Sequence, residues 1–365
     1  MKIAEIIETL EKISPTVYQE DYDNCGLIIG KSDWNCTGIL CSLDATEDVM
    51  LEAKAKGYNL VVAHHPIIFS GLKKINGKNY VEEAVIAAIK NDIAVYAIHT
   101  NLDNVIDGVN NKIADALGLI NRKILLPKQD QLMKLFTFVP VEYGEKIKAA
   151  LFEAGGGNIG NYSECSFSVE GTGNFKAGQN SESFVGEIGK RHHEKELKIE
   201  VIFPAYLQNK LVEALIAVHP YEEVAYDVVA LANNFDKIGS GLMAELPEPV
   251  DEAVLLAQIK AAFGLQAIKH TNLLGKKVKK VAVCGGAGSF LIGKAVAAGA
   301  DIFITSDVKY HEFFDANGKM VIADIGHWES EQFTIDLLVG VLKANFPTFA
   351  VLKSEVRTNP VQYFL

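Results

Sequence analysis

The chain has 365 residues, of which 49% are hydrophobic and 22% are charged, and its formal net charge at pH 7 is −11. This composition is typical of a folded globular protein, and the length predicts two or three domains. An acidic chain binds a phosphate backbone poorly, so the charge argues against nucleic acid as a partner. No apolar run approaches the length of a membrane span, so no membrane contact is expected.

Residues 1–14 predict an amphipathic helix instead of a signal peptide, because acidic residues are spread among apolar residues at helical spacing. The cysteines are odd in number and form no CxxC pair, which favours reduced thiols. We therefore expect a cytoplasmic protein.

Strands and helices alternate in the first part of the chain. The pattern predicts strands at 38–44, 59–65 and 94–100, and helices at 47–56, 81–90 and 107–119. The last part repeats this rhythm, with strands at 278–284, 301–305 and 319–324 and helices at 289–299 and 330–344. Such alternation is typical of parallel β-α-β units.

The two outer parts also resemble each other locally. Residues 54–65 align with 296–307, each running from a helix end through a glycine and a short apolar strand to polar residues. On that alignment His65 falls opposite Asp307. The match favours two similar α/β lobes.

The middle of the chain has a different pattern. Strands are predicted at 132–140, 197–204 and 223–231 and helices at 141–155 and 205–218, with a Gly/Asn/Ser-rich stretch at 155–189. Two β-α-β-like halves are the ferredoxin-like pattern. The predicted fold class is therefore α/β, with lobes at 1–127 and 235–365 that form one metal-site core and an inserted ferredoxin-like α+β domain at 128–234.

Three polar motifs each follow a short apolar strand: HHP (64–66), HTNLD (99–103) and GHWESE (326–331). Pro66 predicts a turn, which would place His64 and His65 at a strand end, where α/β folds keep their sites. His327 and Glu331 are four residues apart in a predicted helix, so both lie on one face.

The motifs supply three imidazoles and two carboxylates without a thiolate: His64, His65, Asp103, His327 and Glu331. This set suits zinc, manganese or iron better than calcium. Five ligands are too many for one ordinary catalytic zinc, so we predict two divalent metal ions per chain that share one carboxylate. We favour Glu331 as the bridging residue, with Asp103 as the alternative. Two such ions can activate water and bind a phosphate or carbonyl oxygen. Taken singly, a histidine at a strand end is more often a hydrogen-bonded core residue, and a His-x3-Glu pair is more often a helix surface pair. The combination of these motifs at strand ends favours metal binding.

Further polar residues lie at predicted strand or helix ends. His99, Asp307, His311 and Asp324 could orient metal-bound imidazoles or act as acid/base groups, and His99 and Asp324 could equally be structural caps. The CGGAGS stretch (284–289) could hold a phosphate with its amides, although a tight turn is the simpler interpretation. The second double histidine, in KRHHEKE (190–196), is expected in a solvated loop.

At these motifs the sequence resembles the GTP cyclohydrolase 1 type 2 homologs, also described as NGG-interacting-factor-like proteins. The resemblance rests on DNCGLIIG (23–30), VVAHHPIIF (61–69), HTNLD (99–103), SDVKYHE (306–312) and GHWESE (326–331), and the middle segment, including HPYEEVAYDVV (219–229), looks like that of the longer bacterial members. It implies a dinuclear metal site on the same five residues, an insert similar to the PII/CutA fold, and a homohexamer. Where the family often has a threonine-glycine pair, this chain has Thr305-Ser306.

Three functions follow as hypotheses. The first is a metal-dependent hydrolase acting on a phosphate-bearing or nucleotide-like small molecule. The second is a metal-binding, metal-delivery or regulatory protein in which the insert is a sensor or gate, an argument by analogy of fold. The third is a scaffold with a structural metal, which adjacent histidines without thiolates disfavour.

Overall fold

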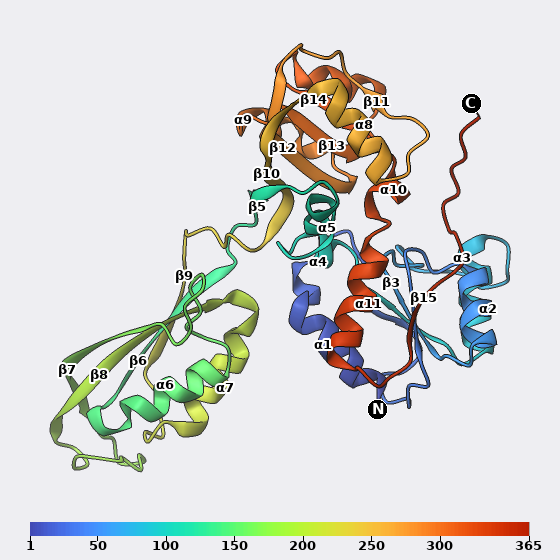
Figure 1. Cartoon of the computed structure of the whole chain (residues 1–365). Coiled ribbons are helices and arrows are strands. Elements are labelled where there is room, and N and C mark those ends of the chain that lie inside the picture. The colour runs from blue at the N-terminus through green and yellow to red at the C-terminus, as the bar shows by residue number, and fades with distance from the viewer. Residues whose placement is uncertain (365) are drawn as a thin grey trace. The chain divides into compact units, whose positions relative to one another are not determined.

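The computed structural model describes residues 1–364, which divide into two compact units. One unit combines Met1–Pro127 with the segment from Asp236 to the end of the chain, and the other is Lys128–Phe235. The second unit therefore interrupts the first in sequence, as the colours of Figure 1 show.

The first unit contains two sheets. The first sheet has the strand order β1-β4-β3-β2-β15, with β1 antiparallel at the edge and the other pairs parallel. Helices α2 and α3 pack together over one face, and α11 covers the other beside α1 (Figure 1). The bounds are α1 Ile3–Ile13, β1 Gly26–Ile29, β2 Ile39–Ser42, α2 Glu47–Ala55, β3 Leu60–Ala63, α3 Tyr80–Lys90, β4 Ala94–Ala97, α11 Thr334–Asn345 and β15 Val351–Lys353. All residues of β2, β3 and β4 are buried, as in a parallel sheet that is covered on both faces.

The second sheet of this unit has the order β11-β14-β13-β12-β10-β5. Its centre, β12 to β14, is parallel, and β5, β10 and β11 add antiparallel strands. Helices α5 and α8 bury apolar side chains on one face, and α9 and the short helix η5 do so on the other. The bounds are α5 Val109–Ala116, β5 Ile120–Pro127, β10 Gly239–Asp251, α8 Glu252–Ala262, β11 Lys269–His270, β12 Lys277–Ala287, α9 Ile292–Ala297, β13 Ile302–Ser306, η5 Tyr310–Ala316 and β14 Val321–Asp324.

The predicted mixed α/β class is confirmed. The two sheets, however, do not follow the predicted division of the chain, because each contains a strand from the other predicted lobe. Strand β5 lies in the second sheet although it precedes Lys128, and β15 at the end of the chain lies in the first sheet. Backbone pairing with partners far along the chain decides both positions, and no local pattern encodes it.

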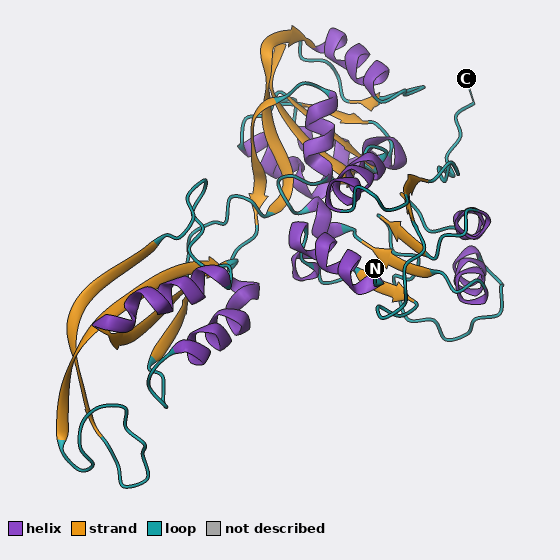
Figure 2. Cartoon of the chain, turned by 60° about the horizontal axis from the view of Figure 1, so that its bottom comes forward, coloured by secondary structure: helices purple, strands orange, loops and turns teal. Residues whose placement is uncertain are grey.

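The second unit is a four-stranded antiparallel sheet of order β7-β8-β6-β9. Helices α6 and α7 lie side by side on one face (Figure 2) and share a core with the inward residues of β6 and β8, such as Leu135 and Ile199. The bounds are β6 Leu132–Pro140, α6 Gly144–Glu153, β7 Ser166–Lys176, β8 Arg191–Pro204, α7 Gln208–Val218 and β9 Tyr226–Ala230.

The structure corrects two expectations in this unit. The Gly/Asn/Ser-rich stretch contains the long strand β7, and KRHHEKE forms the start of β8 instead of a loop. Strand β7 pairs with residues 191–201 of β8 and is largely exposed. Its alternating Phe167, Val169 and Phe175 are interrupted by Gly171 and Gly173, and glycine weakens a strand pattern.

Among residues 1–364, none of the helices combines the length and the apolar character that crossing a bilayer requires.

Candidate metal centre

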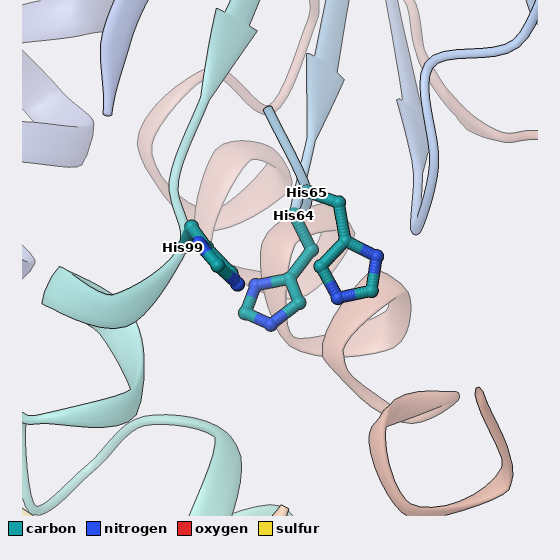
Figure 3. A group of neighbouring side chains, drawn as sticks. All are labelled: His64, His65 and His99. Atoms are coloured by element: carbon teal, nitrogen blue, oxygen red, sulfur yellow. The ribbon is translucent and has the colours of Figure 1, made fainter. Parts of the chain in front are cut away.

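The double histidine follows the buried strand β3. The backbone amides of His64 and His65 still donate to Ser42 and Leu43, so the chain continues beside β2 while it leaves the sheet. The two rings lie 4.9 Å apart between centroids and turn to the same side, and His99 joins them from the end of β4 (Figure 3). The turn predicted from Pro66 is what allows neighbouring residues to face one site.

Asp103 and His99 come from the short helix α4 (Thr100–Asp103) and its N-cap. The ring of His99 lies 5.3 Å from that of His64 and 5.2 Å from that of His65, between centroids. Asp103 Oδ1 lies 3.6 Å from His64 Nε2. Asn110 Nδ2 donates to the Asp103 carbonyl at 3.0 Å and fixes the end of α4.

His327 and Glu331 lie on the short helix α10 (His327–Glu331), which follows β14 of the second sheet. Glu331 is 2% exposed, and its Oε2 is the centre of the cluster. That oxygen lies 3.0 Å from His65 Nε2, 3.2 Å from His327 Nε2 and 3.9 Å from His64 Nε2. Residues of both sheets therefore meet at one carboxylate.

Each of these imidazoles has its other nitrogen fixed by an acceptor. Nδ1 of His64 donates to the Ile98 carbonyl at 2.8 Å, that of His65 to Asp44 at 2.8 Å, and that of His327 to Asp307 at 2.6 Å. Nδ1 of His99 donates to Asp23 at 2.8 Å. Such partners fix the ring orientation and the tautomer, leaving Nε2 directed at the cluster.

The charges of the cluster depend strongly on one another. Burial lowers the pKa of His64 to about 3, so this imidazole is neutral. Burial acts in the same direction on His65, but hydrogen bonds to Asp44 and Glu331 outweigh it and raise the pKa of His65 to about 10. Burial, together with the charge of Glu331, raises the pKa of Asp103 well above its usual range.

Burial would also raise the pKa of Glu331, but the positive charge of His327 and hydrogen bonds from His327 and His65 hold it well below its usual range. The ionised carboxylate is thus balanced by imidazolium groups, which a metal cation can replace, since metal binding requires deprotonated ligands.

Two buried atoms give a direct test of whether these residues suit a metal ion. His64 Nε2 and Asp103 Oδ1 have no hydrogen-bond partner among the described residues. Buried polar atoms are normally paired, and a neutral imidazole whose Nδ1 carries the hydrogen has a lone pair at Nε2. An imidazole nitrogen and a carboxylate oxygen are common ligands of first-row metals. The donor set therefore fits a metal ion.

The ligand atoms form three groups whose members lie within 4.8 Å of one another: His64-His65-His99, His65-His327-Glu331 and His64-Asp103-Glu331. All five predicted ligands belong to these groups, and so does His99. The number and the identity of the ions do not follow from this geometry.

Three other predicted candidates do not belong to the ligand groups. Asp307 orients His327, one of the roles predicted for it. His311 is exposed, and its ring contacts within the described residues are with Tyr310 and Phe314, so it does not join the cluster. Asp324 accepts hydrogen bonds from the amides of Val308 and Gly326 and forms an ion pair with Lys269. These contacts make it a structural cap.

The CGGAGS stretch does not begin with the expected tight turn. Strand β12 continues through it to Ala287, with a register shift after Val283. The amides of Gly285 and Gly286 donate to Asn110 Oδ1 and Ser330 Oγ, so neither is available to bind a phosphate.

Sequence reasoning missed Asp23 and Asp44, the partners of His99 and His65. Asp44 ends the apolar stretch of β2, the same signal that identified the histidines after β3, and this signal could have found it. Asp23 follows no strand, and only its contact with His99 and Thr100 identifies it.

The fold and the site together define an α/β protein with a cluster of histidines and carboxylates that could hold metal ions. Residues 1–360 match the family Duf34/NIF3 (NGG1p interacting factor 3). The chain is similar to a GTP cyclohydrolase 1 type 2 homolog from Halalkalibacterium halodurans, with 38% identity over 100% of both chains. A relative of the same name from Bacillus subtilis is 37% identical over 89% of this chain and 87% of its own.

A solved structure is equally similar. The crystal structure of a Bacillus cereus protein related to NIF3 matches with a TM-score of 0.87 and 36% identity, covering 100% of this chain and 99% of that chain. The chain belongs to the DUF34/NIF3 family.

Proposed function

We propose that this protein binds two divalent metal ions through His64, His65, Asp103, His327 and Glu331, and that it hydrolyses a phosphate-bearing or nucleotide-like small molecule. The observation that carries the proposal is the pair of buried, unpartnered atoms, His64 Nε2 and Asp103 Oδ1, beside the ionised Glu331. A closed structural site has no need for so many imidazoles and usually contains thiolates.

Two ions are supported by the way the ligand groups divide. One group is His65, His327 and Glu331, and another is His64, Asp103 and Glu331, so one carboxylate belongs to both. Glu331 is therefore the proposed bridging ligand. Imidazole and carboxylate ligands favour zinc, manganese or iron.

The bound ions would supply water activation and electrophilic binding of a phosphate or carbonyl oxygen. The chain's own residues orient the ligands through Asp44, Asp307 and the Ile98 carbonyl. His99 keeps its Nδ1 hydrogen on Asp23 and presents Nε2 to the cluster, so it is the group that we propose accepts a proton from the reacting molecule.

The test is the metal content per chain of protein purified without chelator. We expect about two metal ions in the wild type, in accord with two-metal hydrolases, and a loss in His64→Ala/His65→Ala. The matched control is His192→Ala/His193→Ala, which removes the other double histidine, in β8. Wild-type protein that stays metal-free after incubation with zinc, manganese and iron would refute metal binding.

Hydrolysis is tested separately on metal-loaded protein. Turnover of phosphoesters, nucleotides or cyclic amides should require Glu331, so Glu331→Gln should abolish it while the protein remains folded. The curated relatives carry the name GTP cyclohydrolase 1 type 2 homolog, so GTP belongs in the substrate panel. If the loaded wild type leaves the whole panel unchanged, the hydrolase proposal fails, although metal binding can still stand.

The second candidate is metal delivery or regulation, with residues 128–234 as an inserted sensor or gate between lobes at 1–127 and 235–365. It is favoured by the strand order β7-β8-β6-β9 with two helices on one face, which is what a β-α-β-β-α-β ferredoxin-like fold requires. Hydrogen exchange of the full chain with and without metal should then differ within residues 128–234. Identical exchange in both states would count against this candidate.

We also propose that the protein is cytoplasmic and forms a homohexamer. Sedimentation of the purified protein can test the oligomeric state.

A further inference from the structure

A hollow of about 710 Å³ lies within the second unit, on the sheet face that α6 and α7 leave open. Side chains alternate between the faces of a strand. Leu135 of β6 and Ile199 of β8 belong to the core under the helices, whereas Phe138 and Lys198, offset by an odd number of residues, line the hollow. Its volume lies within the range of small-molecule sites.

Two glycines of β7 create the space. Val169, Gly171, Gly173 and Phe175 all line the hollow, so the two middle positions of this face carry no side chain. A Cβ on Gly171 would meet no atom within 4 Å, and one on Gly173 would collide with Glu196 Oε2. The missing side chain of Gly171 thus leaves space for a bound molecule, and that of Gly173 leaves space for the carboxylate of Glu196.

Glu196 is largely buried, and only one of its two carboxylate oxygens accepts a hydrogen bond from a described residue. Glu196 is 7% exposed, and its Oε1 accepts a hydrogen bond from Tyr221 Oη at 2.8 Å. No described residue donates a hydrogen bond to its Oε2. Lys198 lies next to it on the same face, but its Nζ is 2.8 Å from Glu200 and 4.4 Å from the ring centre of Phe136. Glu196 lines the hollow, so an N–H group of a bound molecule can donate to this oxygen, and such a charge-assisted hydrogen bond is stronger than one between neutral groups.

Aromatic rings surround this carboxylate. The ring of Tyr221 lies 6.1 Å from that of Phe184 and 6.5 Å from that of Phe175, between centroids, and all three line the hollow. Glu222 and Glu223 add negative charge to the lining. Aromatic faces and carboxylates both attract a flat cation.

We propose that this hollow is a binding site for a small planar aromatic molecule that carries a cationic or N–H donor group, such as an amidine or an amino-substituted heteroaromatic ring. The donor group pairs with Glu196 Oε2, and the ring packs on Phe175, Phe184 and Tyr221. The site is independent of the metal centre and of its proposed chemistry.

Three probes of nearly equal shape test the charge of the site: benzamidine, benzamide and benzoate. Titration calorimetry with the full chain should give tightest binding for benzamidine, about tenfold or more above benzoate, because a hydrogen bond to a charged group is worth that much. Absence of benzamidine binding, including exclusion by a second copy of the chain that covers this face, would overturn the proposal. So would equal affinity for benzoate.

Three variants locate the binding. Glu196→Gln should remove the preference for benzamidine over benzamide. Gly171→Leu should block all three probes, since Gly171 lines the hollow and a Cβ there meets no atom within 4 Å. The matched control Glu170→Gln changes an exposed carboxylate on the opposite face of β7 and should bind as the wild type does. Unchanged affinity in a folded Gly171→Leu protein, judged by thermal melting, would place the probe elsewhere and refute the site.

Discussion

Asp44 accepts the Nδ1 hydrogen of His65 at 2.8 Å, and the hydroxyl of Thr358 donates to the other oxygen of the same carboxylate. Thr358 thus fixes the carboxylate that orients His65, a candidate ligand at the end of β3. In metal sites such partners fix the imidazole and strengthen it as a ligand.

We therefore expect Asp44→Asn to weaken metal binding by about 10–100-fold, the usual effect of losing a carboxylate that orients a ligand histidine. Competition with a chelator of known affinity measures the change. Asp48→Asn is the control, because Asp48 is an exposed carboxylate on α2. Equal affinity of the Asp44 variant and this control would show that His65 needs no such support.

Gly286 offers a steric test of the site. Its φ is +63°, and an added Cβ would collide with Glu331 Oε1 and lie 3.4 Å from His327 Cε1. Gly299 has a similar φ of +75°, but its Cβ would meet nothing within 4 Å. Both alanine variants lose about 1–2 kcal/mol to the left-handed backbone. Only Gly286→Ala should also lose metal, as elemental analysis can show, and equal metal content in the two would mean that Glu331 adjusts freely.

The variant His99→Ala is expected to affect hydrolysis without affecting metal binding. In the proposed scheme it is a proton acceptor and not a required ligand, so His99→Ala should keep its metal content and lose hydrolysis. The measurements are elemental analysis and the rate on whichever substrate the wild type turns over. Loss of metal in this variant would instead make His99 a sixth ligand, in keeping with its place beside His64 and His65.

Metal should also stabilise the fold. A ligand that binds only the native state adds about 2.7 kcal/mol when its concentration is 100 times Kd. We expect the melting temperature of stripped protein to rise as zinc or manganese is added, and His64→Ala/His65→Ala to show no rise. A stripped protein that melts at the same temperature with and without metal would contradict binding at the buried cluster.

The grouping of the five candidate ligands was predictable because its signals are local. His64 and His65 follow an apolar strand, and the i, i+4 spacing of His327 and Glu331 needs only one helical turn. Asp307, the partner of His327, was among the predicted orienting residues, and the strand-end signal could also have found Asp44. The contact of Asp44 with Thr358 was not predictable, since 314 positions separate the two residues.

The same difference between local signals and long-range contacts applies to the strands of the fold. The buried strands of both sheets were visible as apolar runs, but β7 was not, because it is exposed along most of its length and two glycines interrupt its apolar residues. The place of β15 beside β2 depends on long-range pairing alone.

His65 and Glu331 are in contact although 266 positions separate them in the sequence. The intervening chain includes the whole of Lys128–Phe235. A ribosome that synthesises this protein therefore releases the double histidine long before the glutamate exists, and the nascent N-terminal segment offers only part of the ligand set. Under the proposed function, metal ions would meet the complete binding site only after nearly all of the polypeptide has been made, which would make metal loading a late step of maturation.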